Sequence, residues 1–281
     1  MLRRHGVTEA RGALLALLLM LPGGLRGESA WKLVWHDDFD GHAVDPAKWE
    51  FEVNASGGGN HELQYYLARN ASVSDGHLVI TARHEHFTGP GGTREYTSSR
   101  LRSRLKGDWT YGRFEMRAQL PKGKGIWPAF WMMPTDSRYG GWPHSGEIDL
   151  LELIGHEPAT AYGTLHWSDP SGHHTNSGGK YRLPASVGTF ADGFHLFALE
   201  WEASEMRWYV DGIQYHSVKR WPADAGAPPR PFDQRFHLIL NLAVGGDWPG
   251  TPDAATVFPQ EFVVDYVRVY QRTISGSPND K

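Results

Sequence analysis

The chain has 281 residues, 28 of them basic and 32 acidic, so its formal net charge is −4 with histidine neutral. A weakly acidic protein of this kind has no electrostatic reason to bind nucleic acid or an anionic membrane surface. The sequence contains no cysteine, which excludes disulfides, thiolate metal sites and a cysteine nucleophile. Its 12 tryptophans favour β-structure and stacking on the flat faces of sugar rings.

The first 30 residues have the pattern of a secretory signal peptide. Three arginines precede an apolar run over residues 13–21, and small residues follow around residues 27–30. Such a run is too short to span a bilayer as a mature helix. We therefore expect residues 1–30 to be removed. The mature protein is expected to be a monomer, secreted to the extracellular space or the periplasm and not bound to a membrane.

From Trp31 onward, short segments of β-type composition follow one another, for example residues 31–35 and 78–83. Residues 113–120 alternate polar and apolar side chains, as a half-buried strand does. Asp75-Gly76 and Asp211-Gly212 separate such segments, and Asp-Gly is a strong signal for a type I′ hairpin turn. The pattern predicts a chain of strands and hairpins.

No long stretch has helical spacing, and no internal repeat or linker divides the chain. We expect one all-β domain over residues 31–272, followed by a polar tail at residues 273–281. Many short strands with turn signals between them are typical of a sandwich or a barrel. A sandwich with one curved sheet can form a long concave groove, and a groove lined by acids and tryptophans suits an extended polysaccharide.

Residues 146–154 form an apolar segment that carries three carboxylates, Glu147, Asp149 and Glu152. Side chains alternate between the two faces of a strand, so Glu147 and Asp149 share one face and Glu152 falls on the other. A β-bulge between Asp149 and Glu152 would turn all three acids to one face, and bulges often lie beside active sites.

The alternative for this segment is the solvated polar face of an edge strand. Two aromatic-rich segments, residues 126–133 and 164–167, flank the three acids and favour a lined cleft instead. Clustered acids in a cleft are candidates for functional groups with shifted pKa values.

Several motifs follow one another along the chain. They are Gly59-Asn60-His61-Glu62-Leu63-Gln64-Tyr65-Tyr66, Tyr111-Gly112-Arg113-Phe114-Glu115, Gly125-Ile126-Trp127-Pro128-Ala129-Phe130-Trp131-Met132, Gly146-Glu147-Ile148-Asp149-Leu150-Leu151-Glu152, Thr164-Leu165-His166-Trp167, Leu240-Asn241-Leu242-Ala243-Val244-Gly245-Gly246 and Asp265-Tyr266-Val267-Arg268-Val269-Tyr270. In this order they resemble glycoside hydrolase family 16, and most closely its bacterial laminarinase-type endo-β-1,3-glucanases. The resemblance covers nearly the whole predicted mature chain.

The resemblance implies a β-jelly-roll sandwich of two antiparallel sheets with a concave substrate cleft. It also implies retaining hydrolysis through a glycosyl-enzyme ester, with Glu147 as nucleophile, Glu152 as general acid/base and Asp149 between them. Retaining enzymes hold their two working carboxyls about 5–5.5 Å apart, one ionised and one protonated. The extra residue between Asp149 and Glu152 matches the laminarinase branch, which implies activity on β-1,3-glucan or mixed β-1,3/1,4-glucan.

The resemblance further implies residues that contact the polysaccharide. The candidates are Trp127, Trp131, His166, Asn60, Arg113, Trp142 and Asn241. The two tryptophans of residues 126–133 would stack on glucose units, unless one of them belongs to the core. The histidine would donate a hydrogen bond to a carboxylate. For the histidine and the remaining polar candidates, the alternative is a scaffold role.

Many members of the family bind Ca²⁺, and the matching residues here are Asp38, Gly76 and Asp265. Asp265 shares a face with Val267 of a predicted strand, where a carboxylate is costly unless it is paired or bound to a cation. Oxygen ligands suit Ca²⁺. The alternative is an arginine or backbone partner for the carboxylate. No organic cofactor is expected.

Other functions remain open on the same fold. A non-catalytic β-glucan-binding protein typically lacks a catalytic glutamate, whereas both are present here. A transglycosylase intercepts the same ester with a sugar, and hydrolases of agar, carrageenan and xyloglucan share the three acids. The adjacent His173 and His174 do not form an H-E-x-x-H pattern, so they are predicted to lie in a solvated loop.

Overall fold

The computed structural model describes residues 30–273. The predicted signal peptide, apart from Ala30, and residues 274–281 of the predicted tail lie outside the described residues. Within the described part, no helix is long and apolar enough to cross a membrane.

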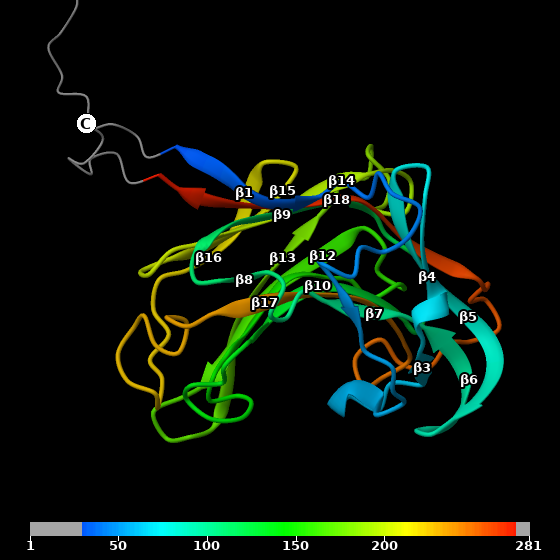
Figure 1. Ribbon diagram of the computed structural model, residues 1–281, viewed down its shortest axis with the longest axis horizontal. Helices are drawn as coiled ribbons and strands as arrows, with labels where there is room; N and C mark the ends of the chain where they lie inside the picture. Colours follow the sequence, from blue (N-terminus) through cyan, green and yellow to red (C-terminus); the bar gives the residue numbers. More distant parts are fainter. Residues whose placement is uncertain (1–29, 274–281) are drawn as a thin grey trace, which may run out of the picture.

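Two β-sheets lie one above the other (Figure 1). The ten-stranded sheet, called the outer sheet, has the order β16-β15-β14-β9-β18-β5-β6-β3, with β1 beside β18 and β4 beside β5. Its strands are β1 (Trp31–Asp37), β3 (Gln64–Tyr66), β4 (Ala71–Ser74), β5 (His77–Gly89), β6 (Gly92–Ser98), β9 (Gly112–Gln119), β14 (His195–Trp201), β15 (Met206–Val210), β16 (Ile213–Val218) and β18 (Gln260–Arg272).

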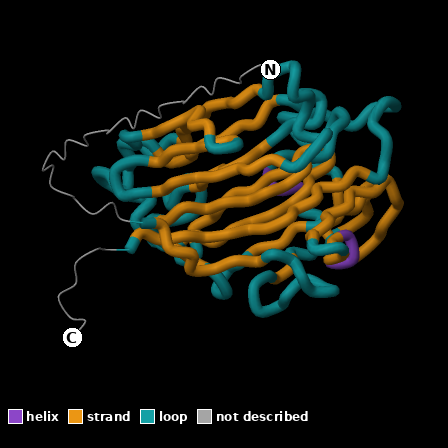
Figure 2. The backbone as a smooth tube through the Cα atoms, turned by 90° about the horizontal axis from the view of Figure 1, so that it is seen from above, coloured by secondary structure: helices purple, strands orange, loops and turns teal. Residues whose placement is uncertain are grey.

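The eight-stranded sheet, called the cleft sheet, has the order β13-β12-β11-β10-β17-β7-β2, with β8 beside β17. Its strands are β2 (Glu50–Phe51), β7 (Arg100–Arg102), β8 (Asp108–Trp109), β10 (Ile126–Pro134), β11 (Glu147–Glu152), β12 (Thr160–Ser168), β13 (His174–Arg182) and β17 (Phe236–Val244). Two short 3₁₀ turns, η1 (Gly57–Gly59) and η2 (Ala68–Asn70), flank β3. Figure 2 shows the strands running side by side across the molecule, with loops at their ends.

Both predicted Asp-Gly hairpins are confirmed. Asp75-Gly76 joins β4 to β5, and its φ angles are 52° and 75°. Asp211-Gly212 joins β15 to β16, with φ angles of 49° and 79°. Positive φ at both central residues is the geometry that a type I′ turn requires, and it explains why an Asp-Gly pair occurs at each turn.

The core lies between the two sheets. In β9 the side chains of Phe114, Met116 and Ala118 are fully buried, and the intervening polar residues are half-buried on the other face, as the alternation predicts. All nine residues of β17 are buried: one face of the strand meets the core, and Asn241 and Ala243 on the other face form part of the floor of the cleft.

The strand β5 belongs to two parts of the fold. Its residues 78–82 pair with β18 in the outer sheet, and its residues 83–89 pair with β6. Figure 1 shows β5 and β6 bending from the outer layer toward the level of the cleft sheet. At this edge β3 pairs with β6 in parallel. The prediction of antiparallel pairing is therefore wrong for this one pair of the described strands.

Candidate active site

The bulge predicted in the carboxylate strand is present in β11. On one side, Asp149 lies opposite Trp131 of β10, but Glu152 lies opposite Ala129, so β11 has one residue more than β10 over this stretch. On the other side, the register with β12 shifts between Asp149 and Glu152 in the same way. The residues between them, Leu150 and Leu151, are buried in the core.

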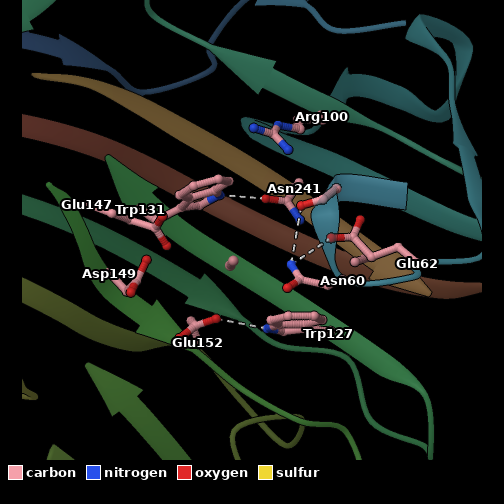
Figure 3. A pocket seen from close by; sticks show the side chains of 12 residues that line it. Asn60, Glu62, Arg100, Trp127, Trp131, Glu147, Asp149, Glu152 and Asn241 are labelled. Carbon is pink, nitrogen blue, oxygen red and sulfur yellow. Dashed lines mark hydrogen bonds between the residues drawn. The ribbon is translucent and has the colours of Figure 1, made fainter. Parts of the chain in front are cut away.

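The bulge brings the three carboxylates to one face of the cleft sheet. Glu147 and Glu152 are half-buried, and Asp149 is only 2% exposed. Figure 3 shows the three side chains along one strand, facing the tryptophans of the next strand. The alternative of a solvated edge strand is excluded, because β11 lies between β10 and β12.

Glu147 and Glu152 line a cleft with a volume of about 760 Å³, and Asp149 lines a smaller adjoining pocket together with them. The wall of the cleft on one side is the loop around Gly58 and Asn60, and on the other side His174 and Asn176 of β13. Side chains from at least five segments line it between these limits: Arg100, Trp127, Trp131, Met133, Trp142, Glu147, Glu152, Thr164, His166 and Trp248. The carboxylates are therefore near the middle of a groove that crosses the strands.

Both tryptophans of β10 face this cleft, so neither is a core residue. Trp127 Nε1 donates a hydrogen bond of 3.1 Å to Glu152 Oε1. Trp131 Nε1 donates one of 2.7 Å to Asn241 Oδ1 of β17 (Figure 3). Each indole is held at its N–H, which leaves its ring available for stacking on a sugar face. Asn60 and Asn241 line the same pocket as the carboxylates.

His166 of β12 contacts Asp149, and His174 of β13 contacts His166 in turn. His166 Nε2 lies 3.1 Å from Asp149 Oδ2, and His166 Nδ1 lies 2.9 Å from His174 Nε2. The Trp142 ring packs on His174, with ring centroids 4.6 Å apart. His173 is exposed in the loop, as predicted, whereas His174 is exposed but begins strand β13, so the predicted loop is wrong for this residue. The imidazole of His166 therefore lies next to the buried carboxylate of Asp149, and the imidazole of His174 lies behind it.

The three acids have strongly shifted pKa values. Burial, followed by the charge of Asp149, raises the pKa of Glu147 to about 8. Burial raises the pKa of Asp149 itself to about 7. Burial, and then the charges of Asp149 and Glu147, raise the pKa of Glu152 well above its usual value. The group therefore holds protons near neutral pH, and both neighbours favour the neutral form of Glu152, as a proton donor requires.

The structure does not bring Arg113 to the cleft, although it was a candidate substrate ligand. Arg113 lies in β9 of the outer sheet, where its Nε is 2.7 Å from Glu115 Oε1 and its Nη1 is 2.9 Å from Glu200 Oε1. The alternation that buries Phe114 points Arg113 to the face of the outer sheet that lies away from the cleft sheet. Its contacts are those of a scaffold residue.

The cleft contains residues that were not predicted, and three of them make specific contacts. The Arg100 guanidinium lies 4.7 Å from the centre of the Trp131 ring. Trp248 packs edge-on against Trp127, with ring centroids 5.7 Å apart. Glu62 is buried and accepts a hydrogen bond of 2.7 Å from Gln64 Nε2. Position next to a matched motif could have indicated Trp248, and Glu62 lies within such a motif. The sequence holds no comparable signal for Arg100.

The residues of the expected Ca²⁺ site lie around one point of β18. The end of β1 pairs with Val267 and the start of β5 pairs with Val264, so the strand register brings Asp38 and Gly76 toward Asp265. The oxygen donors are of the kind that Ca²⁺ binds.

Both carboxylates at this point also have an arginine partner. Asp38 Oδ1 is 2.7 Å from Arg268 Nη2, and Asp265 Oδ2 is 2.5 Å from Arg117 Nη1. A bulge between Val264 and Tyr266 turns Asp265 away from the face of Val267, so the expected face is wrong. An ion must compete with two guanidinium groups here, and Ca²⁺ binding stays a prediction.

Calcium is expected to raise the melting temperature of the protein. An ion that binds only the folded state at a hundred times its Kd adds about 2.7 kcal/mol, and each kcal/mol shifts Tm by about 2–4 °C in a chain of this size. Thermal melts in calcium and in EDTA measure this difference. Asp265→Asn should abolish this difference in Tm. Equal Tm values of the parent protein in calcium and in EDTA would contradict Ca²⁺ binding at this site.

Clustered carboxylates beside aromatic rings in an open groove are the groups that a glycoside hydrolase needs to cleave a sugar chain. The family model described as "Glycosyl hydrolases family 16" matches residues 59–267. The chain belongs to this family.

Relatives and solved structures agree with the family. The chain is 46% identical over 260 residues to a protein named "Beta-glucanase" from Rhodothermus marinus, with 86% of this chain and 85% of the relative covered. It is 42% identical over 253 residues to "Glucan endo-1,3-beta-glucosidase" from Cryptopygus antarcticus, covering 85% and 92%. The solved endo-beta-1,3-glucanase from Pyrococcus furiosus is similar with a TM-score of 0.80 and 44% identity, covering 87% of this chain and 96% of that one.

Proposed function

We propose that the protein is a secreted endo-acting hydrolase of β-1,3-glucan, such as laminarin, or of mixed β-1,3/1,4-glucan. The observation that carries the proposal is the bulge in β11, which gathers Glu147, Asp149 and Glu152 on one face beside Trp127 and Trp131. The names of the similar proteins support the choice of glucan.

In the first step, a carboxylate oxygen of Glu147 attacks the anomeric carbon of the sugar, in the form of the enzyme in which Glu147 has lost its proton and Glu152 keeps one. The bond to the leaving oxygen breaks as Glu152 transfers its proton to that oxygen, and a glycosyl ester forms on Glu147. In the second step, Glu152 removes a proton from water, which attacks the same carbon and releases Glu147. Two inversions leave the anomeric configuration unchanged.

The neighbours of the two glutamates support these roles. The Trp127 N–H donates to Glu152 Oε1, which fixes that carboxyl toward the cleft. Asp149 lies between the two glutamates on the same face, and His166 contacts it at 3.1 Å. Asp149 thus couples the charge of the ester-forming group to that of the proton donor.

The position of the acids supports action within a polysaccharide chain. The groove continues from the carboxylates toward Asn60 on one side and toward His174 on the other. Sugar units can therefore occupy both sides of the cleaved bond, which is the requirement for endo action. An expected consequence is that the viscosity of the polymer solution falls early, before many reducing ends have formed.

A panel of polymers tests the substrate. Laminarin, lichenan, curdlan, xyloglucan and agarose are incubated side by side, and new reducing ends are measured. We expect release from laminarin, with the β-anomer appearing first by NMR. Release from another polymer but not from laminarin contradicts the substrate. Longer oligosaccharides at high acceptor concentration would identify a transglycosylase, and tight glucan binding without cleavage would identify a binding protein.

Secretion is part of the proposal and rests on the N-terminal sequence pattern. The mass of the protein recovered from the medium or the periplasm tests it. Loss of about 30 residues is expected, whereas an intact N-terminus on protein confined to the cytoplasm would contradict it.

A further inference from the structure

The indole of Trp208 crosses the core from one sheet to the other. Trp208 lies in β15 of the outer sheet and is fully buried. Its Nε1 donates a hydrogen bond of 2.8 Å to the backbone carbonyl of Asp149 in β11. A side chain of the outer sheet therefore holds the backbone of the middle carboxylate in the cleft sheet.

The carbonyl that Trp208 holds is at the start of the bulge. Asp149 pairs with Thr164 of β12, and the next pair along the strands is Glu152 with Tyr162. A bulge disrupts the ladder of hydrogen bonds locally, and a buried backbone carbonyl without a partner is unfavourable. The indole N–H supplies a partner at the residue where the strand pairing becomes irregular.

Gly163 of β12 provides the space for this indole. A Cβ atom added to Gly163 would lie 2.3 Å from Trp208 Cδ1 and 2.8 Å from Trp208 Nε1. It would also lie 2.5 Å from the hydroxyl oxygen of Tyr215. Any side chain at this position would push the indole aside. The sequence thus places a residue without a side chain opposite the donor that reaches the bulge.

We propose that Trp208 is a positioning residue for hydrolysis, whose indole N–H fixes the bulge that turns Glu152 to the face of Glu147 and Asp149. The inference rests on the proposed roles of these acids. Trp208 lines no part of the cleft and acts through the backbone of β11. The separation of the two working carboxyls decides whether attack and proton transfer act on one bond, so a relaxed bulge slows chemistry while the sugar-stacking residues stay in place.

The variant Trp208→Phe removes the N–H and keeps an aromatic ring. Trp201→Phe is the matched control, since Trp201 is also a fully buried tryptophan of the outer sheet and its Nε1 has no hydrogen-bond partner within residues 30–273. Both changes remove the same volume from the core. We expect Trp208→Phe to lower kcat by about ten- to a hundredfold with KM nearly unchanged, and Trp201→Phe to leave both nearly unchanged.

The proposal is overturned if folded Trp208→Phe turns over as fast as folded Trp201→Phe on the glucan that the parent enzyme cleaves. If Trp208→Phe does not fold, β-(3-benzothienyl)alanine at position 208 replaces only the N–H by sulfur, and the same loss of kcat is expected. A parent enzyme that cleaves no glucan contradicts the proposed function instead. In that case crystal structures of the two variants decide the inference, because only the change at Trp208 should alter the register between Asp149 and Glu152.

Discussion

Glu147→Gln is expected to abolish hydrolysis, lowering kcat by about 10³-fold or more, because an amide oxygen cannot form the glycosyl ester. The amide has nearly the shape of the carboxyl, so the cleft and its tryptophans stay in place. Polymer binding should therefore survive. Reducing-end assays measure the loss of turnover, and binding of laminarin to the folded variant shows that the cleft is intact.

The same variant is expected to be more stable than the parent protein at alkaline pH. Burial and the charge of Asp149 raise the pKa of Glu147 from the ordinary 4.5 to about 8 in the folded chain. Between these values the folded state binds more protons than the unfolded state, so the free energy of unfolding falls as pH rises and is lowest above pH 8. Glutamine removes this dependence. Because Glu147 is half-buried and partly screened, we expect a rise in Tm of about 2–4 °C at pH 8 and none near pH 4.

Melting curves from pH 4 to 8.5 test this expectation. Glu261→Gln is the control, since Glu261 is an exposed carboxylate of β18 outside the cleft. That change should leave both turnover and the pH dependence of Tm as they are. Turnover by Glu147→Gln at a rate near that of the parent enzyme would overturn the assignment of the nucleophile.

Glu152→Gln is expected to lower kcat on polysaccharide by about 10²–10⁴-fold, the usual contribution of general acid–base catalysis. Glutamine has no proton to give to the leaving oxygen and cannot remove one from water. The Trp127 N–H can still donate to the amide oxygen, so the cleft is expected to keep its shape.

An activated aryl β-glucoside oligosaccharide separates the two steps of this variant. A dinitrophenolate leaves without a proton, so ester formation should be almost as fast as in the parent enzyme. Hydrolysis of the ester should remain slow, and added azide should restore turnover by attacking the ester without a general base. If the rate on the activated substrate falls at each step by the same factor as the rate on polysaccharide, Glu152 is not the acid/base.

The pattern of the carboxylate strand was informative because one face of a strand must be buried. Glu147, Asp149 and Glu152 could share a face only if one residue was absorbed between them, and the structure has its bulge there. The Asp-Gly pairs predicted their hairpins for a similar reason, since positive φ restricts the residues at a turn. In each case a local geometric rule acts on neighbouring residues of the chain.

Contacts between segments far apart in the chain could not be predicted from such local rules. Alternation showed that Arg113 and Phe114 face opposite ways, but not that Arg113 faces away from the cleft. Trp208 contacts Asp149 only because the two sheets pack face to face, and no spacing in the sequence predicts that contact. Arg100 reaches Trp131 through the pairing of β7 with β17, which brings together segments far apart in the chain.

One wall of the groove is a loop that is anchored to the outer sheet through paired strands. The loop of Gly58 and Asn60 leads into β3, which is joined through β6 to β5, and β5 continues into the outer sheet. The end of this loop is therefore tied to the hydrogen-bonded strands that follow it. Because the carboxylates lie between the two walls, a polymer that binds across the groove is cleaved at an internal bond and leaves as two fragments.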